Sequence, residues 1–215
     1  MEKINSQFEV APLNPEIERR IVAKVQRIMS QIGEFEDQPI PIDMQEKLIP
    51  DDYIKQDLAL NKRKEKMFYS AIQYILDSID ARVATLLEGK VPIGVNIWCT
   101  SWSLEDENLP IGEWHLDDEV ERVFIAFGDI ADIECINGEI ELEDFEDDNV
   151  VFAVENGLKA GSITATSIPN NCPVILKPHT IHRKGPHKAG RRLTLDILYS
   201  YGARHRPLTI PGNGI

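Results

Sequence analysis

The sequence predicts an α+β fold, in which helices come first and are followed by short strands that form an antiparallel sandwich or jelly roll. Three observations lead to this prediction. Apolar residues recur at helical spacing within the first 90 residues. Strand-like runs separated by turn residues occupy most of residues 94–199. The 215 residues are also enough to bury a core without disulfide bridges.

Two helical regions are predicted in the N-terminal part. Asn14, Pro15 and Glu16 form a helix start, with a capping side chain, a proline in the first turn and an acid. Apolar residues then follow at helical spacing: Ile17, Ile21, Val25, Ile28 and Ile32. Residues 34–49 contain two prolines and no clear period, so an extended connector is expected there. A second helical region is expected over residues 50–87.

The rest of the chain is rich in strand-forming residues. The expected strands are residues 94–100, 120–127, 132–142, 150–154, 161–167, 174–177 and 193–199. Asn137-Gly138 is a strong turn signal, which predicts that residues 132–142 form two short strands. The acidic run over residues 141–148 is expected to be a solvated loop.

Charge and cysteine content limit the classes of function. Lys plus Arg number 23 and Asp plus Glu number 36, giving a net charge of −13. A field of this sign repels phosphate backbones and anionic lipid, so neither nucleic acid nor a membrane is an expected partner. No apolar run is long enough for a membrane helix, and the first residues do not resemble a secretory signal. Cys99, Cys135 and Cys172 lie far apart in the sequence, which favours a reducing, cytoplasmic location.

A candidate metal site comes from the histidines, all five of which lie in the strand-rich half. In an extended segment, His115 and Asp117 share one face while Asp118 points the other way. A further ligand is available from residues 178–187, which contain His179, His182 and His187. Two histidines and one carboxylate leave coordination positions open, which suits Fe(II) that binds a chelating cosubstrate and O₂.

A candidate anion site lies in the last strong strand. Residues 191–199 alternate, with Leu193, Leu195, Ile197 and Tyr199 on one face. Arg192 and Thr194 share the other face with Asp196, which is expected to pair with an arginine. An arginine that points into a sheet interior requires a partner, and its planar fork matches a carboxylate.

The order His115-x-Asp117, His182 and Arg192-x-Thr194 resembles the Fe(II)- and 2-oxoglutarate-dependent dioxygenase superfamily. Arg192 follows His182 by ten residues, which is similar to the spacing in that family and selects His182 over His179 and His187. The resemblance covers about residues 95–200. It implies a double-stranded β-helix (jelly-roll) core over residues 91–202. A helical region, residues 1–90, would pack outside this core, and residues 203–215 would form an irregular tail.

The resemblance also implies a role for each matching residue. His115, Asp117 and His182 would hold Fe(II), and Arg192 with Thr194 would bind the distal carboxylate of 2-oxoglutarate. Asn96 and Trp98 share one strand face with Thr100 and would contact the cosubstrate. The implied reaction hydroxylates a C–H bond of a small molecule or amino-acid side chain with O₂, releasing succinate and CO₂. The arginine anchor resembles the phytanoyl-hydroxylase-like and amino-acid-hydroxylase-like branches.

Two alternatives remain at this stage. One is a cupin-like jelly-roll hydrolase or isomerase that holds zinc or manganese, although cupins usually carry His-x-His where this chain has His115-Leu116-Asp117. The other is a binding module without metal. Trp102 and Trp114 are expected to pack in the core rather than line a substrate pocket. The primary substrate and the oligomeric state stay open.

Overall fold

The structure is a computed structural model. It describes residues 2–30, 40–43, 62–102, 112–117, 120–128, 132–185 and 190–201 of the 215-residue chain. The helices are α1 (Pro15–Met29), α3 (Lys62–Val83) and α4 (Asp147–Ala160). The first five strands are β1 (Glu2–Ser6), β2 (Phe8–Val10), β3 (Ile40–Asp43), β4 (Val91–Trp102) and β5 (Glu121–Gly128). The others are β6 (Ile133–Leu142), β7 (Thr164–Ile168), β8 (Val174–Leu176), β9 (His182–Lys184) and β10 (Gly190–Ser200).

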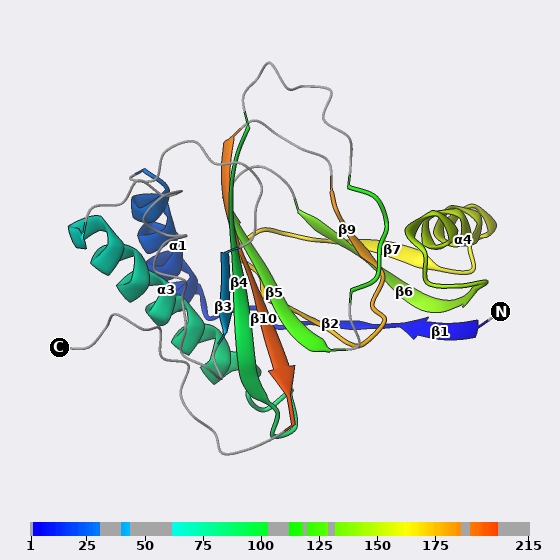
Figure 1. Ribbon diagram of the computed structural model, residues 1–215, viewed down its shortest axis with the longest axis horizontal. Helices are drawn as coiled ribbons and strands as arrows, with labels where there is room; N and C mark the ends of the chain where they lie inside the picture. Colours follow the sequence, from blue (N-terminus) through cyan, green and yellow to red (C-terminus); the bar gives the residue numbers. More distant parts are fainter. Residues whose placement is uncertain are drawn as a thin grey trace.

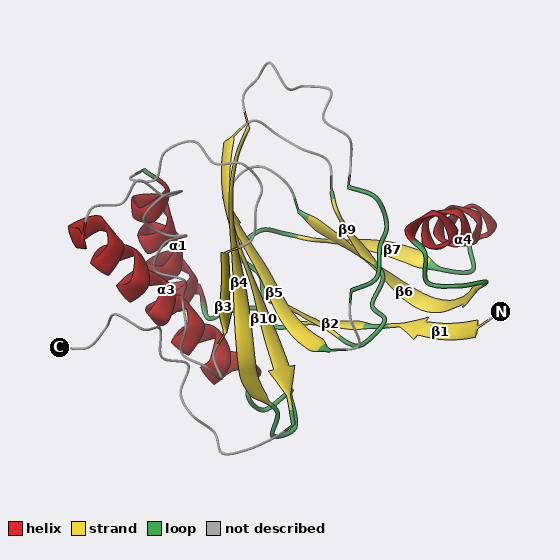
Figure 2. Ribbon diagram, viewed as in Figure 1, coloured by secondary structure: helices red, strands yellow, loops and turns green. Residues whose placement is uncertain are grey.

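The strands form two antiparallel sheets that face each other (Figures 1 and 2). The larger sheet has the order β2-β8-β5-β10-β4-β3. The smaller sheet has the order β1-β6-β7, and β9 also pairs with β6. An isolated bridge between His115 and His182 adds the segment around His115 to the smaller sheet. This mixture of helices and antiparallel sheets is consistent with the jelly roll that the sequence predicts.

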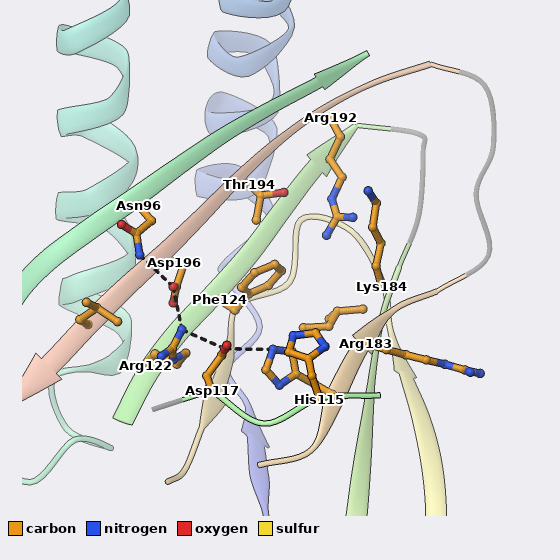
Figure 3. A pocket seen from close by; sticks show the side chains of 13 residues that line it. Asn96, His115, Asp117, Arg122, Phe124, Arg183, Lys184, Arg192, Thr194 and Asp196 are labelled. Carbon is orange, nitrogen blue, oxygen red and sulfur yellow. Dashed lines mark hydrogen bonds and ion pairs between the residues drawn. The ribbon is translucent and has the colours of Figure 1, made fainter. Parts of the chain in front are cut away.

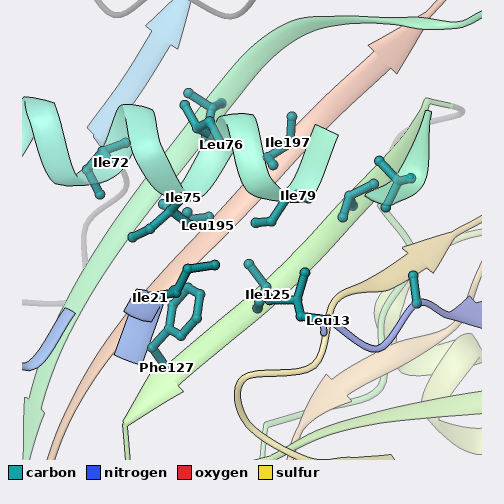
Figure 4. Packing of buried hydrophobic residues seen from close by; sticks show 14 of the residues in the cluster. Leu13, Ile21, Ile72, Ile75, Leu76, Ile79, Ile125, Phe127, Leu195 and Ile197 are labelled. Atoms are coloured by element: carbon teal, nitrogen blue, oxygen red, sulfur yellow. The ribbon is translucent and has the colours of Figure 1, made fainter. Parts of the chain in front are cut away.

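Strand β10 separates the hydrophobic core from the interior between the sheets. It pairs with β4 on one side and β5 on the other. Its apolar residues are almost fully buried in the main hydrophobic cluster: Leu193, Leu195, Ile197 and Tyr199. Helices α1 and α3 supply the other side of this cluster, from the outer face of the larger sheet (Figure 4). The alternation that the sequence predicts for this strand is the one observed.

Helix α1 begins where its capping residues predict. The side chain of Asn14 accepts a hydrogen bond from the backbone N–H of Glu16 at 2.9 Å. Pro15 is the first helical residue, and acids in the first turn complement the helix dipole. The helix ends at Met29, before Ile32, the last residue of the predicted apolar pattern.

Truncating a residue at the centre of the main cluster is expected to destabilise the protein strongly. Ile75 on α3 has no exposed surface and packs in the cluster shared with β10. Ile75→Ala should therefore lower the free energy of unfolding by about 2–5 kcal/mol, as a transfer and a cavity cost combine. Urea denaturation followed by circular dichroism measures this. Phe152→Ala is the matched control, because Phe152 is 69% exposed and its loss should change stability by less than about 0.5 kcal/mol. Equal effects of the two substitutions would contradict the packing described.

The prediction of a strand at residues 150–154 is wrong, because these residues lie in α4. Val150 and Val154 are fully buried on one face of the helix, four residues apart. Asp147 and Asp148 stand in the first turn, where acids stabilise a helix, so the end of the expected acidic loop is helical too. Burial of the valine face outweighs the strand preference of the individual residues.

The prediction of two short strands around Asn137-Gly138 is also wrong, because β6 is one continuous strand. Its first half pairs with β7 and β9, and its second half pairs with β1. Gly138 has φ +137°, and a Cβ atom there would lie 3.0 Å from Ile163. The glycine thus permits a bend and a close contact within a strand instead of a turn.

The N-terminal strands β1 and β2 were not expected. The side chain of Ser6 explains part of their attachment, because it donates a hydrogen bond to the carbonyl of Ile136 at 2.8 Å. It also accepts one from the backbone N–H of Ile181 at 2.9 Å, next to a candidate metal ligand.

None of the described helices is long and apolar enough to cross a membrane.

Candidate active site

The structure brings together three side chains that the sequence singles out for a metal. One ligand atom from each of His115, Asp117 and His182 lies within 4.8 Å of the other two. The two imidazole rings have centroids 4.4 Å apart, and His182 Nε2 lies 3.2 Å from Asp117 Oδ2. Within the described part of the chain, this is the one such group of three histidine, cysteine or acidic residues.

Backbone pairing holds the two histidines next to each other. The N–H of His115 donates to the carbonyl of His182 at 3.1 Å, and the N–H of His182 donates to the carbonyl of His115 at 3.1 Å. Residues that exchange both hydrogen bonds are direct neighbours across a ladder, so their side chains project to the same side. On its other edge, His182 pairs with Cys135 of β6. The position of both rings is therefore set by the sheet.

The tautomer of each histidine follows from its backbone contact. His115 Nδ1 lies 2.9 Å from the carbonyl of Glu113, and His182 Nδ1 lies 3.1 Å from the carbonyl of Thr180. A carbonyl oxygen only accepts, so each Nδ1 carries the proton. In the neutral imidazole the lone pair is then on Nε2, and a hydrogen bond of this kind is what orients metal-binding histidines.

The charges at this group suit a divalent cation. Burial and the neighbouring His182 lower the pKa of His115, which keeps its imidazole neutral. Burial acts to raise the pKa of Asp117, but the hydrogen bond to His182 and the positive charge of Arg122 outweigh it. The pKa of Asp117 falls to about 2, so the group is a carboxylate at neutral pH. Two acceptors, His182 Nε2 and Asp117 Oδ2, thus converge at 3.2 Å and require a cation, either a proton or a metal, between them.

A cavity of about 490 Å³ connects this group to the inner face of the larger sheet (Figure 3). Arg192, Thr194 and Asp196 line it from β10, and Asn96 lines it from β4. Arg192 is 3% exposed, with its guanidinium carbon 5.9 Å from the centroid of the Phe124 ring. A buried guanidinium and a hydroxyl on one strand face form a suitable site for a carboxylate.

Arg122 at the start of β5 is a pocket residue that the sequence analysis missed. Its Nη1 lies 2.9 Å from Asp117 Oδ2 and 2.9 Å from Asp196 Oδ2. The side-chain amide of Asn96 donates to the same oxygen of Asp196 at 3.3 Å. Asp196 therefore pairs with an arginine, as expected, and the partner is Arg122. The signal in the sequence was the alternation of β5, which puts Arg122 on the same face as Phe124.

Other residues singled out by the sequence take different positions. Trp98 pairs through its backbone with Thr194, and its side chain lies outside the described residues. The side chains of Thr100 and Trp102, and the whole of Asp118 and His187, also lie outside them. His179 has φ +62° and stacks on Phe145 with centroids 5.7 Å apart, outside the ligand group.

Trp114 and Cys135 pack in the interior. Trp114 is 2% exposed in the cluster beneath α4. The guanidinium of Arg183 lies 4.1 Å from its ring centroid, and Arg183 Nε lies 2.6 Å from a carboxylate oxygen of Glu134. Burial raises the pKa of Cys135 to about 12, which makes its thiol unreactive.

Metal binding at this site is expected to depend on pH through His115 rather than through Asp117. Because the pKa of His115 is lowered from 6.5 and that of Asp117 lies at about 2, neither of these two ligands carries a competing proton at neutral pH. Affinity should be constant above about pH 7 and fall as the pH drops below about 6, where protons compete for the imidazole. Titration with Co(II) between about pH 5 and 8 measures this. An affinity that continued to rise above neutral pH would contradict the protonation states described.

No protein-family model and no curated protein matches the chain. Solved structures do match it. The non-heme alpha ketoglutarate dependent epimerase SnoN from nogalamycin biosynthesis has a TM-score of 0.54 and 11% sequence identity, covering 98% of this chain and 87% of its own. HygX from Streptomyces hygroscopicus has a TM-score of 0.50 and 8% identity, covering 94% and 85%. AviO1 from Streptomyces viridochromogenes has a TM-score of 0.48 and 16% identity, covering 94% and 93%.

These identities are low, so the likeness concerns the fold. The alignment with SnoN covers 98% of this chain, and the alignment with HygX covers 94%. HygX was solved with nickel and 2-oxoglutarate bound. The chain thus shares its fold with SnoN, a non-heme α-ketoglutarate-dependent enzyme.

Proposed function

We propose that the protein is an Fe(II)- and 2-oxoglutarate-dependent dioxygenase. It would hydroxylate a C–H bond of a small molecule or an amino-acid side chain and release succinate and CO₂. One observation carries this proposal. Two histidines and one carboxylate gather on one wall of a cavity whose opposite wall carries the buried Arg192 and Thr194. The fold shared with SnoN supports the same class of enzyme.

The ligand set fits Fe(II). His115 and His182 hold Nδ1 against backbone carbonyls and so present Nε2 to a metal, and Asp117 presents a carboxylate. Together they match the set of two histidines and one carboxylate found in non-heme iron oxygenases. When bound, Fe(II) supplies coordination positions for the keto acid and for O₂. The protein's part is to hold the three donors in place through the backbone bridge and the carbonyl contacts of Nδ1.

Arg192 and Thr194 would orient the cosubstrate. A guanidinium donates two parallel hydrogen bonds to a carboxylate, and a threonine hydroxyl adds one more. Both side chains are at least nine-tenths buried on the cavity wall. Because the surroundings are shielded from water, the charge pair would be stronger than at the surface. The distal carboxylate of 2-oxoglutarate would lie here, with the keto-acid end toward the metal group.

The proposal extends to the architecture and the cellular setting. The two facing sheets would be a double-stranded β-helix, with α1 and α3 packed outside it. The acidic net charge of −13 favours a small-molecule or amino-acid substrate over nucleic acid. The scarce cysteines, of which Cys135 and Cys172 are free thiols, favour a cytoplasmic enzyme.

The test is an anaerobic titration of the metal-free protein with Fe(II) and 2-oxoglutarate, followed by visible absorption. A weak charge-transfer band that requires both additions is expected, because it arises only when the keto acid chelates the iron. Fe(II) with succinate is the control, since succinate lacks the keto group and should give no band. If the protein binds iron but never develops the band, the proposal fails and a cupin-like metalloprotein is favoured. If it binds no metal, a binding module is favoured.

A further inference from the structure

A continuous chain of polar contacts leads from the larger sheet to the carboxylate of the metal group (Figure 3). Asn96 on β4 donates to Asp196 on β10 at 3.3 Å. Arg122 on β5 contacts the same Asp196 oxygen at 2.9 Å and reaches Asp117 at 2.9 Å. Three adjacent strands of one sheet are therefore linked, through Arg122, to one oxygen of Asp117 in the proposed metal site.

The middle of this chain of contacts, Arg122 and Asp196, is buried. Asp196 is 1% exposed as a residue, and the side chain of Arg122 is 10% exposed. The side chain of Asp117 is 33% exposed, so packing alone does not fix its carboxylate. Among the described residues, the second oxygen of Asp196 has no hydrogen-bond partner. A buried carboxylate with only one oxygen satisfied needs its cation, which gives Arg122 a fixed position.

Both carboxylates contact one nitrogen atom, Arg122 Nη1. The arginine therefore acts at this point through one nitrogen, with a hydrogen bond to Asp196 and an ion pair with Asp117. A lysine ammonium can replace a single donor, whereas it replaces a two-bonded fork poorly. This makes the effect of Arg122→Lys a direct test of the geometry.

The charges of Arg122 and Asp196 cancel each other close to the metal group. An isolated guanidinium at this distance from Asp117 would repel a divalent cation. Because Asp196 lies 2.9 Å from the same nitrogen, Arg122 forms an ion pair with Asp117 while the Arg122–Asp196 pair carries little net positive charge. Arg122 can therefore orient the Asp117 carboxylate without repelling the metal ion that this carboxylate would bind.

We propose that Arg122 is a positioning residue that orients the Asp117 carboxylate for metal binding, and that Asp196 with Asn96 holds Arg122 in place and cancels its charge. The proposal rests on the proposed function only in requiring that His115, Asp117 and His182 bind a divalent metal. It does not depend on the cosubstrate, on O₂ or on the identity of the substrate.

The experiment is an anaerobic Co(II) titration of the whole protein, which reports both the dissociation constant and the shape of the visible absorption band. The main variant is the double substitution Arg122→Met/Asp196→Asn, which removes the contact without leaving a buried unpaired charge. Its affinity for Co(II) should fall about 10–100-fold, as for other residues that orient a metal ligand, with an altered band. Asp196→Asn alone should also weaken binding, because the arginine charge is then not cancelled. Arg122→Lys should retain most of the wild-type affinity for Co(II), because the lysine ammonium keeps a positive charge at this position.

Lys177→Met is the matched control. Lys177 and Lys90 both bond to Glu121, the buried neighbour of Arg122 on the same strand, but outside the cavity. This variant should change thermal stability without changing Co(II) affinity or the band. Circular dichroism shows whether each variant is folded.

The outcomes separate this inference from the proposed function. A folded double variant that binds Co(II) as the wild type does, with the same band, overturns the inference and leaves the dioxygenase proposal intact. A folded Arg122→Lys variant that loses Co(II) affinity also overturns the inference, because a positive charge at one nitrogen would then not be enough to position Asp117. A wild-type protein that binds no Co(II) overturns both.

Discussion

Arg192→Met is expected to weaken the binding of 2-oxoglutarate by about 30-fold or more, which corresponds to at least about 2 kcal/mol for removing one partner of a buried charge pair. The reason is that Arg192 is 3% exposed on the cavity wall, where water cannot replace the lost guanidinium. The measurement is the 2-oxoglutarate concentration that half-saturates the charge-transfer band of the anaerobic Fe(II) protein.

A second keto acid provides the control. The compound 2-oxopentanoate has the same chelating end but lacks the distal carboxylate, so Arg192→Met should change its binding little. Arg192→Lys should lie between the wild type and the methionine variant, because the charge stays and the fork is lost. If the methionine variant weakened both keto acids equally, Arg192 would not be the anchor of the distal carboxylate.

His182→Ala is expected to abolish measurable metal binding at micromolar metal, a loss greater than the 10–100-fold typical for residues that only orient a ligand. The fold should survive, because the bridge to His115 uses the backbone N–H and carbonyl of residue 182, which alanine keeps. Co(II) titration measures the metal affinity, and thermal unfolding checks the fold.

His179→Asn is the matched control for this variant. His179 lies three residues earlier, outside the ligand group, and has φ +62°, a conformation that asparagine tolerates. Its substitution should leave the metal affinity unchanged. The opposite pattern, with His179→Asn losing metal and His182→Ala retaining it, would show that the ligand has been assigned to the wrong histidine.

Local patterns in the sequence were enough to find most of the candidate site. His115 and Asp117 are two residues apart on an extended segment, so the period of a strand places them on one side. The same period separates Arg192 and Thr194 from Leu193 and Leu195, as the structure has them. The helix start at Asn14 likewise depends on neighbouring residues only.

Features that depend on distant partners were not predictable in this way. Strand β1 pairs with β6 across more than 130 residues, for example Lys3 with Glu141. The contacts of Arg122 involve Asp196, 74 residues away. At Val150 and Val154, burial against β6 overrides the strand preference of valine. In each case the deciding interaction is tertiary, so a local pattern does not identify the partner.

The alternation of core-facing and cavity-facing side chains along β10 limits which insertions and deletions the protein can tolerate. One face of the strand belongs to the main hydrophobic cluster, and the other lines the cavity. Inserting or deleting a single residue between Leu193 and Asp196 would exchange the two faces, because side chains alternate with a period of two. Such a change would bury charged groups among the helices and put leucines on the cavity wall that Arg192 and Thr194 line. Loops can gain or lose residues, whereas the number of residues in β10 is constrained both by packing of the hydrophobic cluster and by the side chains that line the cavity.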